Sequence, residues 1–214
     1  MKTLAKKELK LIKYIKNRYE RGFSVNLMIV GRARTGKSLY ALYLMKMITD
    51  YMIENNIDIE SRMSMGLDLK LFKEENKVIL LDDIGAEIYR GFGEEYENKD
   101  KLYKILLTSQ MQHFVLILTT NFVNDIEVIR RFLDFVIEVR RINLDGRDYL
   151  FVKVWRIYQM NITGRVIAKT VLRYKIPFDI ILKFYKAHFE AIYSEIKKKF
   201  VAKMLSEKTK PSLL

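Results

Sequence analysis

The sequence predicts an α/β fold in which a parallel sheet is flanked by helices, with a β-hairpin and a helix added at the C-terminal end. Three observations lead to this prediction. Between residues 25 and 141, short apolar runs of strand length alternate with segments of helical periodicity. The first apolar run leads directly into a glycine-containing loop and then a helical segment. Acidic or polar residues follow the next two runs, as expected at the carboxyl edge of a sheet.

Composition narrows the class of protein. The chain has 214 residues, which fits one domain with an appendage, and half of them are apolar, so a folded core is expected. With no cysteine and two histidines, a disulfide framework and a thiolate or histidine-rich zinc site are excluded. The longest uncharged apolar run, residues 114–123, is shorter than the roughly 20 residues that cross a bilayer, and no secretory signal is recognisable. We therefore expect a cytoplasmic protein with no membrane partner.

The charge is strongly basic and unevenly distributed. The formal net charge is +13, and its excess lies in residues 1–21 and 130–214, whereas residues 22–129 are slightly acidic. Two basic ends around a slightly acidic body favour a polyanionic partner, most commonly nucleic acid. A lysine-rich surface that only maintains solubility would have the same composition.

The chain divides into three predicted parts. Residues 1–22 form a basic amphipathic helix, which we expect to dock on the domain, although a membrane-surface helix would have a similar pattern. Residues 23–141 form the α/β core, and residues 142–214 form the C-terminal hairpin and helical extension with a frayed tail.

The elements of the core and the extension follow from periodicity. Strands are predicted at 25–30, 78–81, 114–118 and 134–139, and helices at 39–53, 101–111 and 125–131. Residues 85–100 have neither period and are expected to form a mobile loop beside the site. Beyond residue 141, strands at 149–160 and 166–174 predict an antiparallel hairpin, and a helix runs from residue 178 to about residue 203.

Residues 31–38 match the pattern G-x-x-x-x-G-K-S and stand between a strand and a helix, which is the context of a phosphate-binding loop. In such a loop the backbone N–H groups and the helix N-terminus face the phosphates of ATP. Lys37 would reach the β and γ phosphates, and the Ser38 hydroxyl would bind Mg²⁺. A glycine-rich turn without a nucleotide is the alternative. The predicted nucleotide contacts are Gly31, Arg34, Thr35, Gly36, Lys37, Ser38 and Leu39.

Two adjacent carboxylates follow the second strand. Asp82 is predicted to hold Mg²⁺ through water, and Asp83 to orient the attacking water. In isolation, two acids after an apolar strand would indicate only a capped turn. Beside a phosphate loop they predict a Mg²⁺-dependent ATP hydrolase.

Polar residues after the third strand and before the fourth are further candidates. The Asn121 amide would hold the nucleophilic water near the γ-phosphate, with Thr120 as the second candidate and a simple turn as the alternative. Arg130 or Arg131 would reach the nucleotide of a neighbouring subunit as an arginine finger. The alternative for these arginines is a solvated helix end favoured by the macrodipole.

Residues 81–87, 118–121 and 130–132 resemble the AAA+ ATPases, and among them the helicase-loader and transposition-helper group typified by DnaC and IstB. The resemblance covers about residues 25–140. It implies a P-loop NTPase core with Walker A at 31–38, Walker B at Asp82 and Asp83, sensor 1 at Asn121, and an arginine finger at Arg130 or Arg131. It also implies an ATP-dependent ring or filament on DNA, hence a homo-oligomer, and a helicase or other replication protein as a partner.

The sequence departs from the AAA+ pattern in two places. The stretch between Ser38 and Asp82 is short, and no helical lid with a sensor 2 arginine is evident after Arg141. The chain also resembles the compact viral packaging and DNA-pumping ATPases, which usually place glutamine where Asn121 stands. The expected function is therefore an ATPase that loads helicases or remodels DNA in replication or transposition, with a packaging ATPase as the alternative. A nucleotide-gated adaptor with negligible hydrolysis and a small-molecule kinase also remain open.

Overall fold

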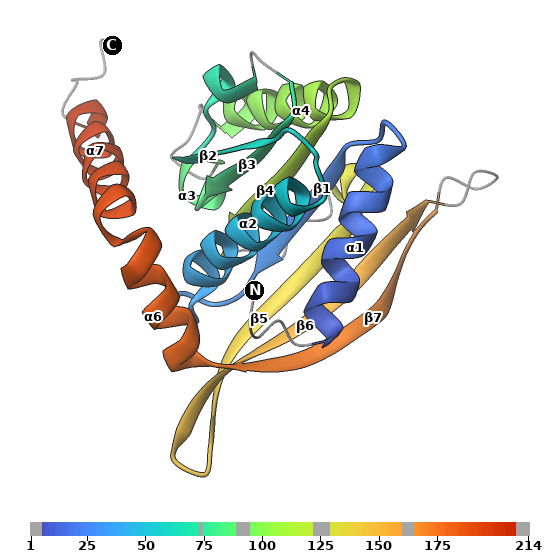
Figure 1. Cartoon of the computed structure of the whole chain (residues 1–214). Coiled ribbons are helices and arrows are strands. Elements are labelled where there is room, and N and C mark those ends of the chain that lie inside the picture. The colour runs from blue at the N-terminus through green and yellow to red at the C-terminus, as the bar shows by residue number, and fades with distance from the viewer. Residues whose placement is uncertain (1–5, 73–74, 89–94, 122–128, 160–164, 209–214) are drawn as a thin grey trace.

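A computed structural model describes residues 6–72, 75–88, 95–121, 129–159 and 165–208. Its centre is one seven-stranded sheet in the order β2-β3-β4-β1-β5-β6-β7 (Figure 1). The first five strands in this order are parallel, and β6 and β7 continue the sheet in antiparallel pairing. The strands are β1 Val25–Val30, β2 Glu60–Met65, β3 Lys77–Asp82, β4 Phe114–Thr120, β5 Phe135–Leu144, β6 Arg147–Gln159 and β7 Val166–Pro177.

Helices cover both faces of the sheet. Alternate residues of β1 belong to different cores, since Leu27 and Ile29 face one side and Met28 and Val30 face the other. The first core holds side chains of α1, α2, α6 and α7, and the second holds those of α3 and α4. Among the described helices, none is long and apolar enough to cross a membrane. The helices are α1 Lys6–Glu20, α2 Lys37–Glu54, α3 Ile84–Ile88, α4 Glu95–Met111, α6 Phe178–His188 and α7 Glu190–Lys208, with 3-10 turns η1 Leu69–Phe72 and η2 Arg130–Phe132.

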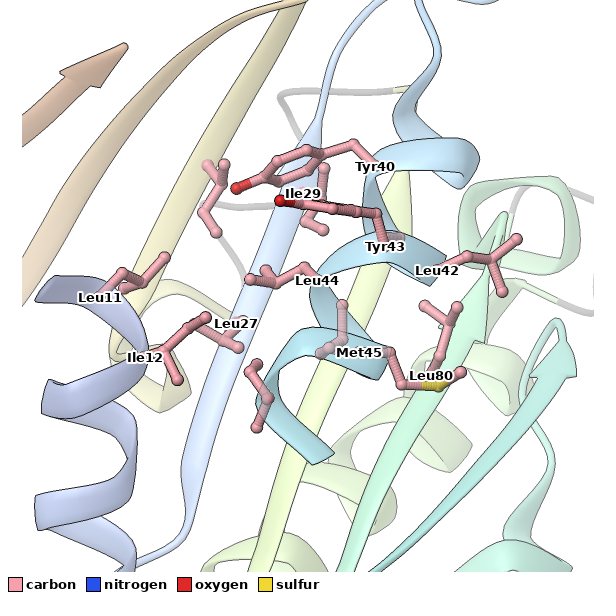
Figure 2. Close-up of a cluster of buried hydrophobic side chains, with 14 of the residues drawn as sticks. Leu11, Ile12, Leu27, Ile29, Tyr40, Leu42, Tyr43, Leu44, Met45 and Leu80 are labelled. Atoms are coloured by element: carbon pink, nitrogen blue, oxygen red, sulfur yellow. The ribbon is translucent and has the colours of Figure 1, made fainter. Parts of the chain in front are cut away.

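The N-terminal helix α1 is part of the first core. Leu11 and Ile12 point toward α2 and β1 in Figure 2, and Ile15 beside them is fully buried. Arg18, on the last turn, forms an ion pair with Asp134 at 3.0 Å and so ties α1 to the start of β5. Docking of this helix on the domain, as its apolar stripe predicts, is confirmed.

The strand order brings the candidate site residues to one edge of the sheet. β4 lies between β1 and β3 and is parallel to both, as the sequence interpretation requires. The three strands therefore end side by side, β1 in the phosphate loop, β3 in the acidic pair and β4 before Asn121. Ligands of α/β sheets bind at this carboxyl edge.

The predicted hairpin belongs to the main sheet. β5 continues to Leu144, five residues beyond its predicted end, and pairs with β6 along its whole length. Asp145 and Gly146 join the two strands, with φ of 50° and 77°. Positive φ at both central residues is typical of a type I′ turn, which suits the twist of a hairpin.

Three other expectations need correction. The stretch 85–100 was expected to be a loop, but α3 occupies its start and α4 begins at Glu95; residues 89–94 lie outside the described part. The long C-terminal helix is two helices, α6 and α7, separated at Phe189. The predicted helix 125–131 falls mostly outside the described residues, and Arg130 and Arg131 stand in the 3-10 turn η2.

Candidate functional site

The phosphate loop connects β1 to α2, and its glycines stand where a side chain would collide. A Cβ on Gly31 would lie 2.4 Å from the Val139 carbonyl oxygen of β5. Gly36 has a φ of 93° and is packed against Leu150 and Phe178, each 3.1 Å from the position of a Cβ. Both positions therefore require glycine, Gly31 for space and Gly36 for backbone conformation as well.

The ammonium group of Lys37 points into the site from the first turn of α2. Lys37 is only 8% exposed. Its Nζ donates to Oδ1 of Asn121 at 2.5 Å and to the Arg32 carbonyl at 3.5 Å. Burial lowers the pKa of Lys37, and the negative charges of Asp82 and Asp83 oppose this shift. A buried cation with two acids nearby is suited to meet the phosphates of a nucleotide.

Asp82 is held rigidly at the end of β3. It is 1% exposed, and the Thr119 hydroxyl of β4 donates to its Oδ1. The same Thr119 oxygen accepts a hydrogen bond from the Asp83 backbone N–H at 2.8 Å. Thr119 therefore fixes both acids, a role that the sequence interpretation did not assign to it.

Asp83 and Asn121 complete the arrangement around Lys37. The Asn121 amide donates to Oδ1 of Asp83 at 3.4 Å while its oxygen accepts from Lys37, so it links a base candidate to the phosphate-binding cation. Burial raises the pKa of Asp83, the neighbouring Asp82 raises it further, and Lys37 and Lys197 oppose the shift. A carboxylate positioned by an amide at this edge is suited to accept a proton from water.

The C-terminal helix α7 also reaches the site, which the sequence interpretation missed. The Tyr193 hydroxyl donates to Oδ2 of Asp82, and Ser38 lies close to the same phenol group. Burial and the nearby Asp82 raise the pKa of Tyr193. Lys197, one helical turn later, acts electrostatically on Asp83. Tyr193 is 111 residues from Asp82 in the chain, and nothing in its local sequence marks it as a site residue.

The oxygen atoms of Ser38 and Asp82 fit a magnesium site. The Tyr193 hydroxyl donates to Asp82 and lies close to Ser38, so both oxygens are near one point and could meet at a shared hard cation. A cation held there would compete with Tyr193 for Asp82. Within the described part of the chain, no group of three or more His, Cys, Asp or Glu side chains is placed to bind a metal ion. Nucleotide phosphates and water would supply the other ligands of a Mg²⁺ ion held by Ser38 and Asp82.

The remaining predicted contacts lie on the loop and the first turn of α2. Arg34 is exposed at the loop tip with a φ of 63°, and the Thr35 hydroxyl donates to the Arg32 carbonyl at 2.8 Å. Leu39 packs against the first core, and Thr120 is buried at the end of β4. Asn121, the first of the two sensor candidates, contacts both Lys37 and Asp83.

Arg130 and Arg131 lie far from the phosphate loop of their own chain. They precede β5, which is parallel to β1, so they stand at the edge where these strands begin, whereas the loop follows the end of β1. The six residues of β1 span about 20 Å. Arg131 stacks on Phe132, with its guanidinium 5.0 Å from the ring centroid. The topology therefore places these arginines at the opposite end of β1 from the phosphate loop of their own chain.

Comparisons with known proteins find distant structural likeness only. No family model matches the sequence, and no curated protein matches it significantly. Similar solved structures include the KaiC-like protein PH0186 of Pyrococcus horikoshii OT3, with a TM-score of 0.43, 11% identity, and coverage of 68% of this chain and 89% of that one. The flagellar accessory protein FlaH of Methanocaldococcus jannaschii has a TM-score of 0.42 at 13% identity, covering 74% and 96%.

The Orc1 protein of Aeropyrum pernix, solved in complex with DNA, has a TM-score of 0.43 at 17% identity, covering 60% of this chain and 42% of that one. At these scores, none of the likenesses assigns a family or an activity. The P-loop fold is evident from the chain itself, in the strand order and in the glycine loop between β1 and α2.

Proposed function

We propose that the protein is a Mg²⁺-dependent ATPase that acts on DNA. The observation that carries this proposal is the chain of contacts from Lys37 through Asn121 to Asp83, at the edge where β1, β4 and β3 end. A phosphate-binding cation, an amide and a carboxylate in this order are what hydrolysis of a terminal phosphate requires.

Each residue has a role in the proposed reaction. Backbone N–H groups of residues 31–38 and the Lys37 ammonium bind the phosphates, and Ser38 and Asp82 hold Mg²⁺, which neutralises charge on the phosphates when bound. Asp83 orients the attacking water and accepts its proton, and Asn121 positions Asp83 and that water. The products are ADP and phosphate, and positioning with electrostatic stabilisation supplies most of the catalysis.

The opposite placement of the arginines supports an assembly that shares its sites. A finger that is separated from its own loop by the length of β1, about 20 Å, would act at the nucleotide site of another subunit. We therefore propose a ring or filament in which Arg130 or Arg131 meets the neighbour's γ-phosphate. The net charge of +13 favours binding of this assembly to DNA. Such an assembly fits a helicase loader or remodeller in replication or transposition. Its partner would be a helicase or another replication protein.

Two rival functions differ in what they do with ATP and DNA. A packaging or translocating ATPase would hydrolyse ATP fastest on double-stranded DNA. A nucleotide-gated adaptor would bind ATP but release little phosphate. The Asp83–Asn121 contact favours hydrolysis over the adaptor, because a switch needs no positioned base.

Steady-state phosphate release with and without single- and double-stranded DNA, combined with a sizing measurement, tests the proposal. We expect multiple turnovers that need Mg²⁺, stimulation by DNA, and an oligomer when ATP is present. Binding of ATP without turnover would overturn the ATPase in favour of the adaptor. Turnover that DNA leaves unchanged, with no DNA binding, would overturn the DNA function.

A further inference from the structure

The outer half of the sheet has a face that carries cations and aromatic rings. Val139 of β5, Val152 of β6 and Tyr174 of β7 are neighbours across the sheet and belong to the first core. The residues before and after each of them along its strand therefore face the other side. The register places Phe151 between Arg140 and Lys175 on that side, and Lys153 between Glu138 and Arg173 in the next row. Trp155 follows one row further along β6. We call this surface the outer platform: Arg140, Phe151, Lys153, Trp155, Arg173 and Lys175.

The described helices leave most of the outer platform uncovered. α1 and α6 pack on the opposite face of these strands, and α3 and α4 belong to the second core over β1, β3 and β4. That second core reaches the outer half of the sheet at Val136, Trp155 and Ile157. Arg140, Arg173 and Lys175 are exposed, and the remaining platform residues are partly exposed.

The positive charge of the platform favours an anionic partner. The two rows of the register contain four cations and one acid. The acid is Glu138, which forms an ion pair with Arg140. The cations lie on three neighbouring strands, spaced about 4.8 Å apart, and so form a band rather than a point. A band of cations of this kind can bind successive charges of a repeating anion such as a phosphate backbone.

The rings specify which form of nucleic acid fits. Nζ of Lys153 lies 4.3 Å from the Trp155 ring centroid, and Nζ of Lys175 lies 4.9 Å from that of Tyr149. A lysine that leaves a ring to meet a phosphate exposes the ring face for a base. Bases can stack on protein rings only where they are free of a complementary strand, which a duplex does not offer.

We propose that the outer platform binds single-stranded DNA, with phosphates on its four cations and bases on Phe151 and Trp155. This inference rests on the proposed function, because it names the DNA form and the surface through which the ATPase would act. Five of the six platform residues lie on β6 and β7, beyond β5 and away from the acidic pair of β3, whereas Arg140 lies on β5 next to Val139, whose carbonyl faces the phosphate loop. DNA would therefore bind mainly at a place separate from the ATP site.

Trp155 is the one tryptophan of the chain, so tryptophan fluorescence reports on a platform residue. Titration of the full-length protein with a thymidine oligonucleotide should quench this signal, whereas a duplex of equal length should leave it nearly unchanged. Phe151→Ala should weaken single-strand affinity by about tenfold or more. The matched control is Phe23→Ala, an aromatic side chain that is 55% exposed away from this surface and should leave the affinity unchanged.

Charge gives a second, independent readout. Lys175→Ala should reduce the salt dependence of binding by about one counterion, and Lys183→Ala on α6 should not. DNA binding that does not change Trp155 fluorescence, and that neither Phe151→Ala nor Lys175→Ala weakens, would overturn the platform but keep the proposed function. No DNA binding at low salt would overturn both. Variants that dissociate an oligomer while retaining DNA affinity would identify a second copy of the chain as the occupant and overturn the proposal.

Discussion

The Tyr193 hydroxyl donates a hydrogen bond to Oδ2 of Asp82, and this contact joins the C-terminal helix α7 to the acidic end of β3. Ser38 lies close to the same phenol group. One side chain thus stands beside both groups that would hold Mg²⁺. A metal ion that binds Oδ2 of Asp82 directly would compete with the Tyr193 hydroxyl for that oxygen.

Tyr193→Phe should therefore strengthen Mg²⁺-dependent nucleotide binding. The ring and its packing against Tyr185, at 6.0 Å between centroids, are retained, and only the competing hydroxyl is lost. A hydrogen bond to a charged group contributes about 1.5–3 kcal/mol, so the Mg²⁺ concentration for half-maximal binding of a fluorescent ATP analogue should fall roughly tenfold. Tyr185→Phe is the matched control. A higher Mg²⁺ requirement in Tyr193→Phe would show that the hydroxyl supports the metal rather than competing with it.

Asp83→Asn should slow hydrolysis while leaving MgATP bound. The amide cannot accept a proton from water, but Asp82 remains fixed by Thr119 and Tyr193. We expect turnover to fall by about 10²-fold or more, with nucleotide affinity changed less than a few fold. Equilibrium binding and phosphate release, measured on the same preparation, separate the two effects. Loss of binding would mean that Asp83, and not Asp82, serves the metal.

The arginine fingers can be tested by mixing inactive variants. Arg130→Ala or Arg131→Ala should lower turnover by roughly 10³-fold with nearly intact ATP affinity. A Lys37→Ala protein lacks a working site but still offers its arginines, so a mixture of the two should recover activity at shared interfaces. The absence of recovery in demonstrably mixed assemblies would reduce Arg130 and Arg131 to a charged turn before β5.

The buried face of α1 should contribute substantially to stability. Ile15 is fully buried, and Ile15→Ala removes its packing in the first core, which costs about 2–5 kcal/mol. Ile53→Ala, at a side chain that is 54% exposed on α2, should change the free energy of unfolding by less than about 1 kcal/mol. Chemical denaturation measures both. Equal effects would mean that α1 is held to the domain weakly.

The interior of the fold could be predicted well because its buried strands consist mostly of apolar residues. β1 has its predicted bounds, and β3 and β4 differ by one or two residues at their ends. β2 was missed since Glu60, Ser61 and Arg62 are exposed at the sheet edge and have no apolar pattern. The Asp145–Gly146 turn was missed although its residue types favour positive φ, and with it the pairing of β5 with β6.

The candidate site divides in the same way. The phosphate loop, the acidic pair and Asn121 could be predicted, because each follows a strand and the strands end together. Thr119 could be located but not its hydrogen bonds to both acids. Tyr193 and Lys197 could not be predicted, since their approach to the site depends on the break at Phe189 and the packing of α7 against β2.

The proposed nucleotide site requires Lys37 to bind the phosphates, and the rate of phosphate release from ATP tests this most directly. Lys37→Ala should abolish turnover, because it removes the buried ammonium that lies beside Asn121. Lys46→Ala removes a lysine of the same helix that pairs with Asp50, and should hydrolyse ATP at the wild-type rate. Wild-type turnover in Lys37→Ala would contradict the assignment of this edge of the sheet as the nucleotide site.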